Sequence, residues 1–425
     1  MIIGLKSKMS KDVIWTFIIQ ITVMICAFVV TKILSNRLSI EDFGQYNLIK
    51  RSVQVLSFVM LAGVGIALPR YIPIYKKGEQ KKSIIPLLAA AFIYILFVSL
   101  IVCIICGLFS EKMQVIILGD NGNKSLLVIT LAYAFALAMA QFSFAYYRGT
   151  GDFKWYNGAQ LAIQLAIITP LVFLPFLTTT NVFLSWLFIT ATIVLFYLIR
   201  ELFIHKIPPL TLYSIKTELN TIIKYSSGRL VADFFLFSLA AYPLIYISNT
   251  LDLQQTAYYS VGITFVTMVT PLYSFMGIIL LPYVSESIAK NNLQEADRFV
   301  NKLALFYFTS AIVIIAFFYV FIGLLTSIFF SNSYLITTDL SRIMILSVLP
   351  QTIYLLYRNP IDAISVIPYN TIILGVCLIV MVLSFCISST LTQLAWAYVA
   401  VSVLQGILSW ITWHMIKKNY IHKSV

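Results

Sequence analysis

The chain has 425 residues, of which 60% are hydrophobic, 15% aromatic and only 11% charged. Soluble globular domains contain about 25% charged residues, so this composition excludes an ordinary water-soluble protein. The net charge of +13 does not call for a nucleic-acid partner, because the cytoplasmic loops of membrane proteins are enriched in Lys and Arg. We therefore predict an all-α integral membrane protein without a nucleic-acid partner.

Apolar runs of roughly 20 residues, enough to cross a bilayer as a helix, recur along the whole chain. Six are predicted near residues 13–34, 52–68, 84–109, 126–147, 156–177 and 182–199. Six more are predicted near residues 230–247, 257–281, 303–329, 343–357, 371–387 and 391–416. With the N-terminus inside, most Lys and Arg fall in inner segments, so the positive-inside rule places both termini in the cytoplasm.

Signatures of catalysis and nucleotide binding are absent from the sequence, which contains no HExxH, no GxxxxGK[ST] and no GxSxG. The cysteines lie in apolar runs and the histidines in or near polar segments, so no metal site is predicted. The sequence therefore predicts a transporter rather than an enzyme, without a cofactor. Its energy would come from a proton or sodium gradient, from the membrane potential, or from consumption of the product outside.

The longest inner connection follows the sixth predicted span and contains Pro208 and Pro209. Apolar residues then recur at helical spacing, which predicts an amphipathic helix on the inner membrane surface. A solvated linker is the alternative interpretation. We predict an N-terminal lobe at residues 1–205, this linker at residues 206–228 and a C-terminal lobe at residues 229–425.

The two halves contain matching residues 213 positions apart. The pairs are Leu38 and Leu251, Tyr46 and Tyr259, Val53 and Val266, Ile66 and Ile279, Pro69 and Pro282, and Asn157 and Asn370. Six spans per half is an even number, so both halves would enter the membrane in the same direction as parallel repeats. The predicted architecture is about twelve transmembrane helices in two six-helix lobes, with substrate bound between them.

Cationic side chains near the second span are the leading candidates for substrate binding. If its helix begins at Glu41 or Asp42, Lys50 lies roughly 12 Å inside it at about 1.5 Å per residue. Helical spacing then places Gln54 on the face of Lys50, and Arg51 beside it suits bidentate phosphate contacts.

The alternative is a helix that begins at Ser52. Lys50 and Arg51 would then reach outward to external headgroups. Lys32, near the outer end of the first span, is a further candidate for the same cationic path.

The second half supplies a smaller set of candidates. Arg229 and Asp233 lie four residues apart at the start of the seventh span, where they would form an ion pair, or Asp233 would serve as a protonatable coupling site. Gln351 and Arg358 share a face of the tenth span and would line the cavity, although an amide within a span also joins helix to helix.

Five segments carry a resemblance to a known family. They are LSNRLSIEDFGQYNLIKR (34–51), GVGIALPRYIP (63–73), YRGTGDFKWYN (147–157), LLPYVSESIAKNN (280–292) and YRNPIDAISVIPYN (357–370). Together they resemble the Wzx-type polysaccharide-unit (O-antigen) flippases of the MOP exporter superfamily.

This resemblance implies a protein of the bacterial inner membrane that moves undecaprenyl-diphosphate-linked oligosaccharide units, such as lipopolysaccharide precursors, to the outer leaflet. Its expected partners are this lipid-linked substrate, membrane lipids, a polysaccharide polymerase and a chain-length regulator. The main alternative is a MATE-like multidrug or cation antiporter, but cationic cargo calls for carboxylates within spans, and the first six predicted spans contain none. A non-enzymatic membrane component of glycan assembly is the third possibility.

Overall fold

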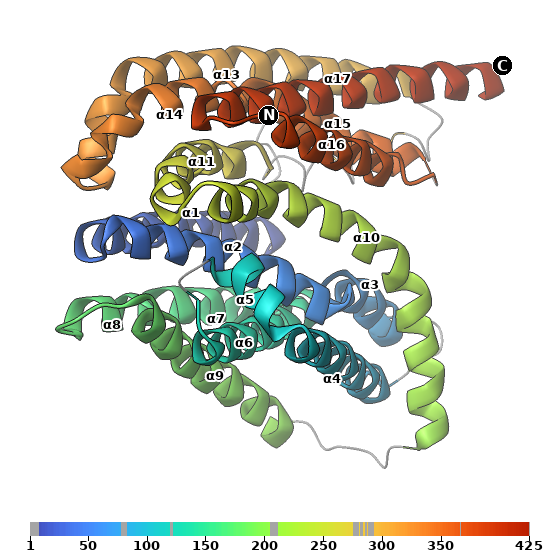
Figure 1. The fold of residues 1–425 in the computed structure, drawn as a ribbon. Helices are drawn as coiled ribbons and strands as arrows, with labels where there is room; N and C mark the ends of the chain where they lie inside the picture. The colour runs from blue at the N-terminus through green and yellow to red at the C-terminus, as the bar shows by residue number, and fades with distance from the viewer. Residues whose placement is uncertain are drawn as a thin grey trace. The chain divides into compact units, whose positions relative to one another are not determined.

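The computed structural model describes residues 8–77, 83–119, 122–204, 211–274, 293–365 and 367–424, with single positions at 280, 284 and 287 (Figure 1). All regular secondary structure within these ranges is helical. Nine of the described helices are long and apolar enough to cross a membrane, or up to eleven if each of two bent helix pairs is one span. The predicted all-α membrane fold is confirmed.

The remaining predicted span, near residues 257–281, begins in helix α11 (Leu253–Ser274) and ends outside the described residues. The chain forms two compact units, Met1–Phe237 and Ser238–Val425. Helix α10 (Leu212–Thr250) runs from the first unit into the second. It is continuous through the described part of the predicted linker, so from Leu212 onward that segment is helical, as expected.

The first unit is arranged around α6, which packs against α2, α3 and α9. Its helices are α1 (Lys8–Arg37), α2 (Ile40–Leu61), α3 (Val64–Lys77), α4 (Ile85–Leu108), α5 (Ser110–Leu118), α6 (Lys124–Thr150), α7 (Phe153–Ala166), α8 (Ile168–Phe173), α9 (Thr179–Ile204) and the beginning of α10. Small residues on α6 permit this central position, since they let neighbouring membrane helices approach closely. A Cβ on Gly149, for example, would lie only 3.0 Å from the carbonyl oxygen of Leu68 in α3.

In the second unit α17 packs against α15 and α16. Besides α11, the helices are α13 (Leu293–Phe329), the 3-10 helix η1 (Asn332–Thr337), α14 (Thr338–Ile345), α15 (Val348–Ile364), α16 (Tyr369–Cys386) and α17 (Leu391–Ser424). A small residue again permits a close contact, because a Cβ on Gly406 of α17 would lie 2.8 Å from the carbonyl oxygen of Pro350.

The internal repeat is visible in the bounds of the helices. Helices α2 and α11 each have 22 residues and begin 213 positions apart. Each is preceded by a polar cap: Ser39 accepts a hydrogen bond from the backbone of Asp42 at 3.0 Å, and Asp252 accepts one from the backbone of Gln255 at 2.6 Å. Such caps satisfy amide groups that have no partner inside the helix. The two halves therefore share the signal that starts this helix.

Bends interrupt two of the spans. Helices α2 and α3 meet at 41° and helices α14 and α15 at 43°. The first bend occurs at Ala62 and Gly63, whose φ angles are +51° and +74°. Ala62 is the only residue other than Gly with positive φ among the described positions, and such a conformation is uncommon for a residue with a Cβ. At Gly63 a Cβ would also meet Ser226 of α10 at 2.8 Å.

Candidate functional site

The position of Lys50 depends on where α2 begins. The helix begins at Ile40, directly after the cap at Ser39, and Glu41 and Asp42 occupy its first turn, where negative charge is favourable. Lys50 is therefore ten residues inside the helix, about 15 Å along its axis. The alternative start at Ser52 is wrong, and with it the expectation that Lys50 lies before the helix.

Lys50 is half-buried, and its ammonium nitrogen lies 5.7 Å from the centre of the Tyr46 ring. Phe183 and Trp186 of α9 hold that ring in place, with centroid distances of 5.9 and 5.8 Å. A cation over an aromatic face at this range is attracted by about 0.5–1 kcal/mol, and by more where water is excluded. The aromatic cluster thus positions a positive charge within the first unit.

The polar side chains that follow Lys50 on α2 contact one another, while their position on a cavity-lining face stays a prediction. The Arg51 guanidinium donates to the side-chain oxygen of Gln54 at 3.2 Å, and both residues are half-buried. One turn later the Ser57 hydroxyl donates to the backbone carbonyl of Gln54 at 2.9 Å. Lys32 lies on α1 with an exposed side chain. Its proposed contribution to the same cationic path stays a prediction.

The second unit has no cation at the matching positions. Lys50 corresponds to Ile263 and Arg51 to Thr264, 213 residues later on α11. Ile263 is buried, and Thr264 donates to the carbonyl oxygen of Ser260 within its own helix. The pair of cations therefore belongs to one repeat alone, although the helix that carries it is present in both.

Gln351 of α15 is occupied by contacts with α17. Its amide nitrogen lies 3.0 Å from the hydroxyl of Tyr398, and 3.3 Å from the hydroxyls of both Ser402 and Ser347. These hydrogen bonds join two helices, which is the second of the two roles that the sequence left open. Binding of substrate by Gln351 stays a prediction that the described contacts do not favour.

Arg358 lies near the end of α15 with a half-buried side chain. Its backbone carbonyl accepts a hydrogen bond at 2.9 Å from Asn370, which also donates to Asp362 at 2.7 Å. This arrangement ties the end of α15 to the start of α16. Asn370 is the repeat partner of Asn157, which in turn donates to Thr16 of α1 at 3.0 Å.

Arg229 and Asp233 both lie on α10. The side chain of Arg229 falls outside the described residues, whereas Asp233 is half-buried. The predicted ion pair and the predicted coupling role of Asp233 therefore stay predictions.

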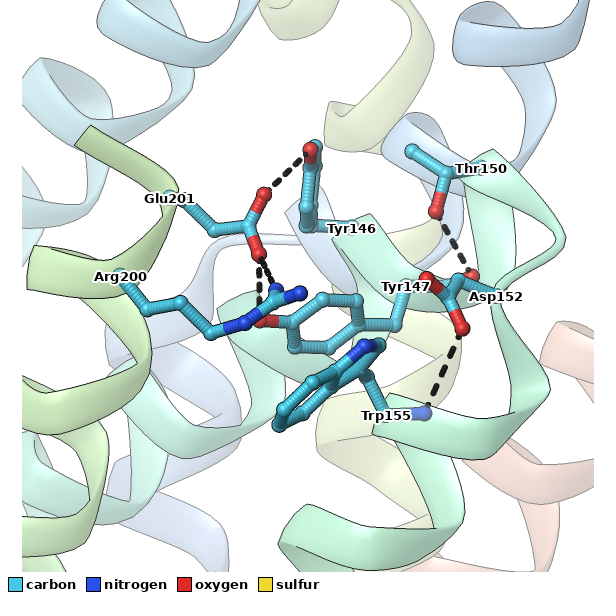
Figure 2. A network of polar contacts seen from close by, with 7 residues as sticks. All are labelled: Tyr146, Tyr147, Thr150, Asp152, Trp155, Arg200 and Glu201. Carbon is cyan, nitrogen blue, oxygen red and sulfur yellow. Dashed lines mark hydrogen bonds and ion pairs between the residues drawn. The ribbon is translucent and has the colours of Figure 1, made fainter. Parts of the chain in front are cut away.

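A polar network that the sequence analysis missed joins α6 to α9 (Figure 2). The two carboxylate oxygens of Glu201 accept hydrogen bonds at 2.9 Å from the hydroxyls of Tyr146 and Tyr147. Arg200 forms an ion pair with the same carboxylate. The two charged side chains are only 24% and 19% exposed, so each needs the partner that the network supplies.

Helix α7 joins this network through Trp155. The guanidinium carbon of Arg200 lies 3.6 Å from the centre of the Trp155 ring, within the range of a strong cation–π contact. The backbone amide of Trp155 faces the carboxylate of Asp152, which caps α7 (Figure 2). The network therefore fixes the turn between α6 and α7 against the end of α9. The only feature of the sequence that could have indicated this network is the pair of adjacent charged residues, Arg200 and Glu201, at the end of the apolar run that forms α9.

No group of three or more His, Cys, Asp or Glu side chains within the described ranges is arranged to hold a metal ion. The candidate functional groups described for the first unit are a cation pair inside α2 and a neutralised carboxylate at the end of α9.

Comparisons with known proteins agree with this architecture. A family model described as polysaccharide biosynthesis protein matches residues 9–288. No curated protein matches the sequence.

Several solved structures share the fold at low sequence identity. An inward-facing MATE multidrug transporter of the MOP superfamily is 12% identical with a TM-score of 0.80, over 95% of this chain and 96% of the other. The lipid II flippase MurJ is 14% identical with a TM-score of 0.73, over 96% and 91%. A MOP superfamily transporter from Pyrococcus furiosus is 13% identical with a TM-score of 0.64, over 96% and 93%.

Proposed function

Because this chain belongs to the family of polysaccharide biosynthesis proteins, we propose that it is a flippase for oligosaccharides linked to a lipid diphosphate. The cargo unit would be carried by undecaprenyl diphosphate and would serve O-antigen or a similar surface polysaccharide. The protein would work by alternating access in the inner membrane of a bacterium, with both termini in the cytoplasm. A polymerase and a chain-length regulator would act on the product.

The observation that carries this proposal is the location of Lys50 and Arg51. Both are half-buried and lie ten and eleven residues inside α2, which together with α3 forms one of the two bent candidate spans. An ionised side chain at the centre of a membrane helix costs about 2.5–3.5 kcal/mol on insertion scales, and such residues mark substrate or ion paths. A diphosphate carries the complementary charge, and a guanidinium can bind it through two parallel hydrogen bonds.

A MATE-like cation antiporter is the second candidate, supported by the MATE transporter that shares the fold. Cationic cargo would be repelled by Lys50 and Arg51. On α2 the carboxylates, Glu41 and Asp42, occupy the first turn only, far from the two cations. This distribution of charge favours anionic cargo.

Coupling to a proton or sodium gradient belongs to the same proposal, with Asp233 as the candidate group. If Asp233 couples transport, Asp233→Asn should leave the protein abundant in the membrane but remove the effect of the gradient. A loss of protein abundance with normal export per molecule would instead identify a structural carboxylate.

The test is transport of a fluorescent polyprenyl-diphosphate oligosaccharide in proteoliposomes, with accessibility at the far leaflet as the readout. Lys50→Ala and Arg51→Ala should each lower the rate at least about tenfold, since a hydrogen bond to a charged group contributes about 1.5–3 kcal/mol. Lys154→Ala, which removes an exposed lysine on α7, is the matched control. Wild-type rates in the Lys50→Ala/Arg51→Ala double variant, or transport of a cationic dye instead, would defeat the proposal.

A further inference from the structure

Helices α4 and α6 separate along part of their length. In the first half of α4, Leu87, Ala90 and Ala91 are completely buried, and Phe92 meets Phe142 of α6 with ring centroids 6.5 Å apart. Further along α4, Leu100 and Leu108 are 59% and 75% exposed. The first half of α4 is therefore covered by neighbouring helices and touches α6 at Phe92, whereas its second half is open.

A groove of about 720 Å³ occupies the space where they diverge. Leu96, Leu100 and Cys103 line it from α4, and Leu131 and Phe135 line it from α6. Nearly all of this lining is apolar, so water filling it inside a bilayer would lose hydrogen bonds without recovering them. Hydrocarbon chains are the occupants that such a surface accepts.

The length of the groove limits what enters it. From Leu96 to Gly107 the lining extends along about 16 Å of α4 at about 1.5 Å per residue, roughly half of a hydrocarbon core about 30 Å thick. The contact between Phe92 and Phe142 closes the deep end. A chain in the groove thus belongs to a lipid of one leaflet, and a carrier lipid that must cross to the other leaflet would be blocked there.

The open end is positively charged. Lys124 lines the groove and is the first residue of α6, so its ammonium group lies at the positive end of the helix dipole, where a cation is unfavourable for the helix itself. A lipid headgroup with a negative charge would relieve this repulsion, and basic sites between membrane helices bind such headgroups.

We propose that the groove between α4 and α6 is a binding site for an anionic phospholipid, with one acyl chain between the helices and the phosphate at Lys124. By the predicted topology this lipid belongs to the outer leaflet. Helix α5 follows the groove directly, and the backbone carbonyl of Leu118 at its end accepts a hydrogen bond from Gln45 of α2 at 3.2 Å. A bound lipid would therefore support the helix that carries Lys50.

Native mass spectrometry of the full chain in detergent tests this site, with palmitoyl-oleoyl phosphatidylglycerol and the matching phosphatidylethanolamine as probes. We expect phosphatidylglycerol to bind about fivefold more tightly, as one lysine near anionic lipid provides. Lys124→Ala should remove the preference. Lys112→Ala, an exposed lysine of α5 that does not line the groove, should retain it.

A second pair of variants tests the groove itself. Leu100→Trp fills it and should weaken binding of both lipids, whereas Ile101→Trp, at a neighbouring exposed residue outside the lining, should not. Equal binding of the two lipids by the wild-type protein, or undiminished binding by Leu100→Trp, would overturn the proposal. Displacement of phosphatidylglycerol by an equimolar polyprenyl phosphate would also overturn it, since the groove would then belong to the carrier lipid.

Discussion

Tyr46 and Tyr259 lie at the same turn of α2 and α11, 213 residues apart, and both are completely buried against the helix that ends their repeat. Their hydroxyl groups differ. That of Tyr259 donates to the carbonyl oxygen of Leu394 at 3.5 Å, whereas that of Tyr46 has no hydrogen-bond partner in the described part of the chain. Both halves thus bury a tyrosine at the same position, but only the tyrosine of the second half forms a hydrogen bond through its hydroxyl group.

This difference predicts opposite effects of the same substitution. Tyr46→Phe should leave the free energy of unfolding unchanged or raise it by up to about 1 kcal/mol, because it removes a buried hydroxyl without a partner. Tyr259→Phe should lower the free energy of unfolding by about 0.5–1 kcal/mol, since it removes a hydrogen bond. Thermal unfolding in detergent measures both, and a greater loss in Tyr46→Phe would mean that its hydroxyl has a partner after all.

The Glu201 network predicts coupled effects. Glu201→Gln should lower the free energy of unfolding by about 1.5–3 kcal/mol, because a charged acceptor is lost and Arg200 remains partly buried without its partner. Tyr147→Phe should cost about 1 kcal/mol. The double variant should cost less than the sum, by about 0.5 kcal/mol or more. Strict additivity in a thermal-unfolding cycle would show that the two side chains act independently.

Substitution of Gln351 distinguishes a structural role of this side chain from a role in substrate binding. Since its amide bonds to Tyr398 and Ser402 of α17, Gln351→Leu should lower the free energy of unfolding by about 1 kcal/mol. Transport per correctly folded molecule should stay normal. Tyr398→Phe, which removes one partner from the other helix, should reproduce part of the loss. A transport defect at full stability would instead place Gln351 in the substrate path.

Gly149 on α6 and Gly158 on the next helix, α7, provide a matched test of how closely α6 packs against α3. Gly149→Ala places a Cβ 2.8 Å from a side-chain carbon of Ile72 and 3.0 Å from the backbone oxygen of Leu68. It should cost about 1–3 kcal/mol through overpacking. Gly158→Ala meets only the Tyr197 hydroxyl at 3.6 Å and should be neutral or stabilising, because Ala favours a helix by about 1 kcal/mol over Gly. Reversal of this order in thermal unfolding would contradict the close approach of α6 to α3.

Much of the fold could be predicted because a helix that crosses the bilayer must be long and apolar. Each such helix is recognisable in the sequence as an apolar run, without knowledge of its neighbours. The start of α2 could also have been decided, since Ser39 followed by Glu41 and Asp42 is a helix-start signal. Hydropathy alone favoured a helix that begins at Ser52, because the preceding turns of α2, which include Lys50, are polar.

Contacts between segments that are distant in the chain could not be predicted from the sequence. Glu201 meets tyrosines more than 50 residues earlier, and nothing in the spacing of apolar residues connects them. The groove at Leu100 lies between two helices that meet at Phe92 and Phe142, and the sequence does not show how closely those helices approach each other beyond that contact. Gln351 shows the reverse case, in which the residue was found but its partners on α17 were not.

The shared caps at Ser39 and Asp252 also have a historical consequence. If the halves descend from one ancestral six-helix subunit, two copies of that subunit in a homodimer would have presented identical charges. Lys50 and Arg51, matched now by Ile263 and Thr264, therefore became different only after the gene was duplicated, when each copy was free to mutate without altering its twin.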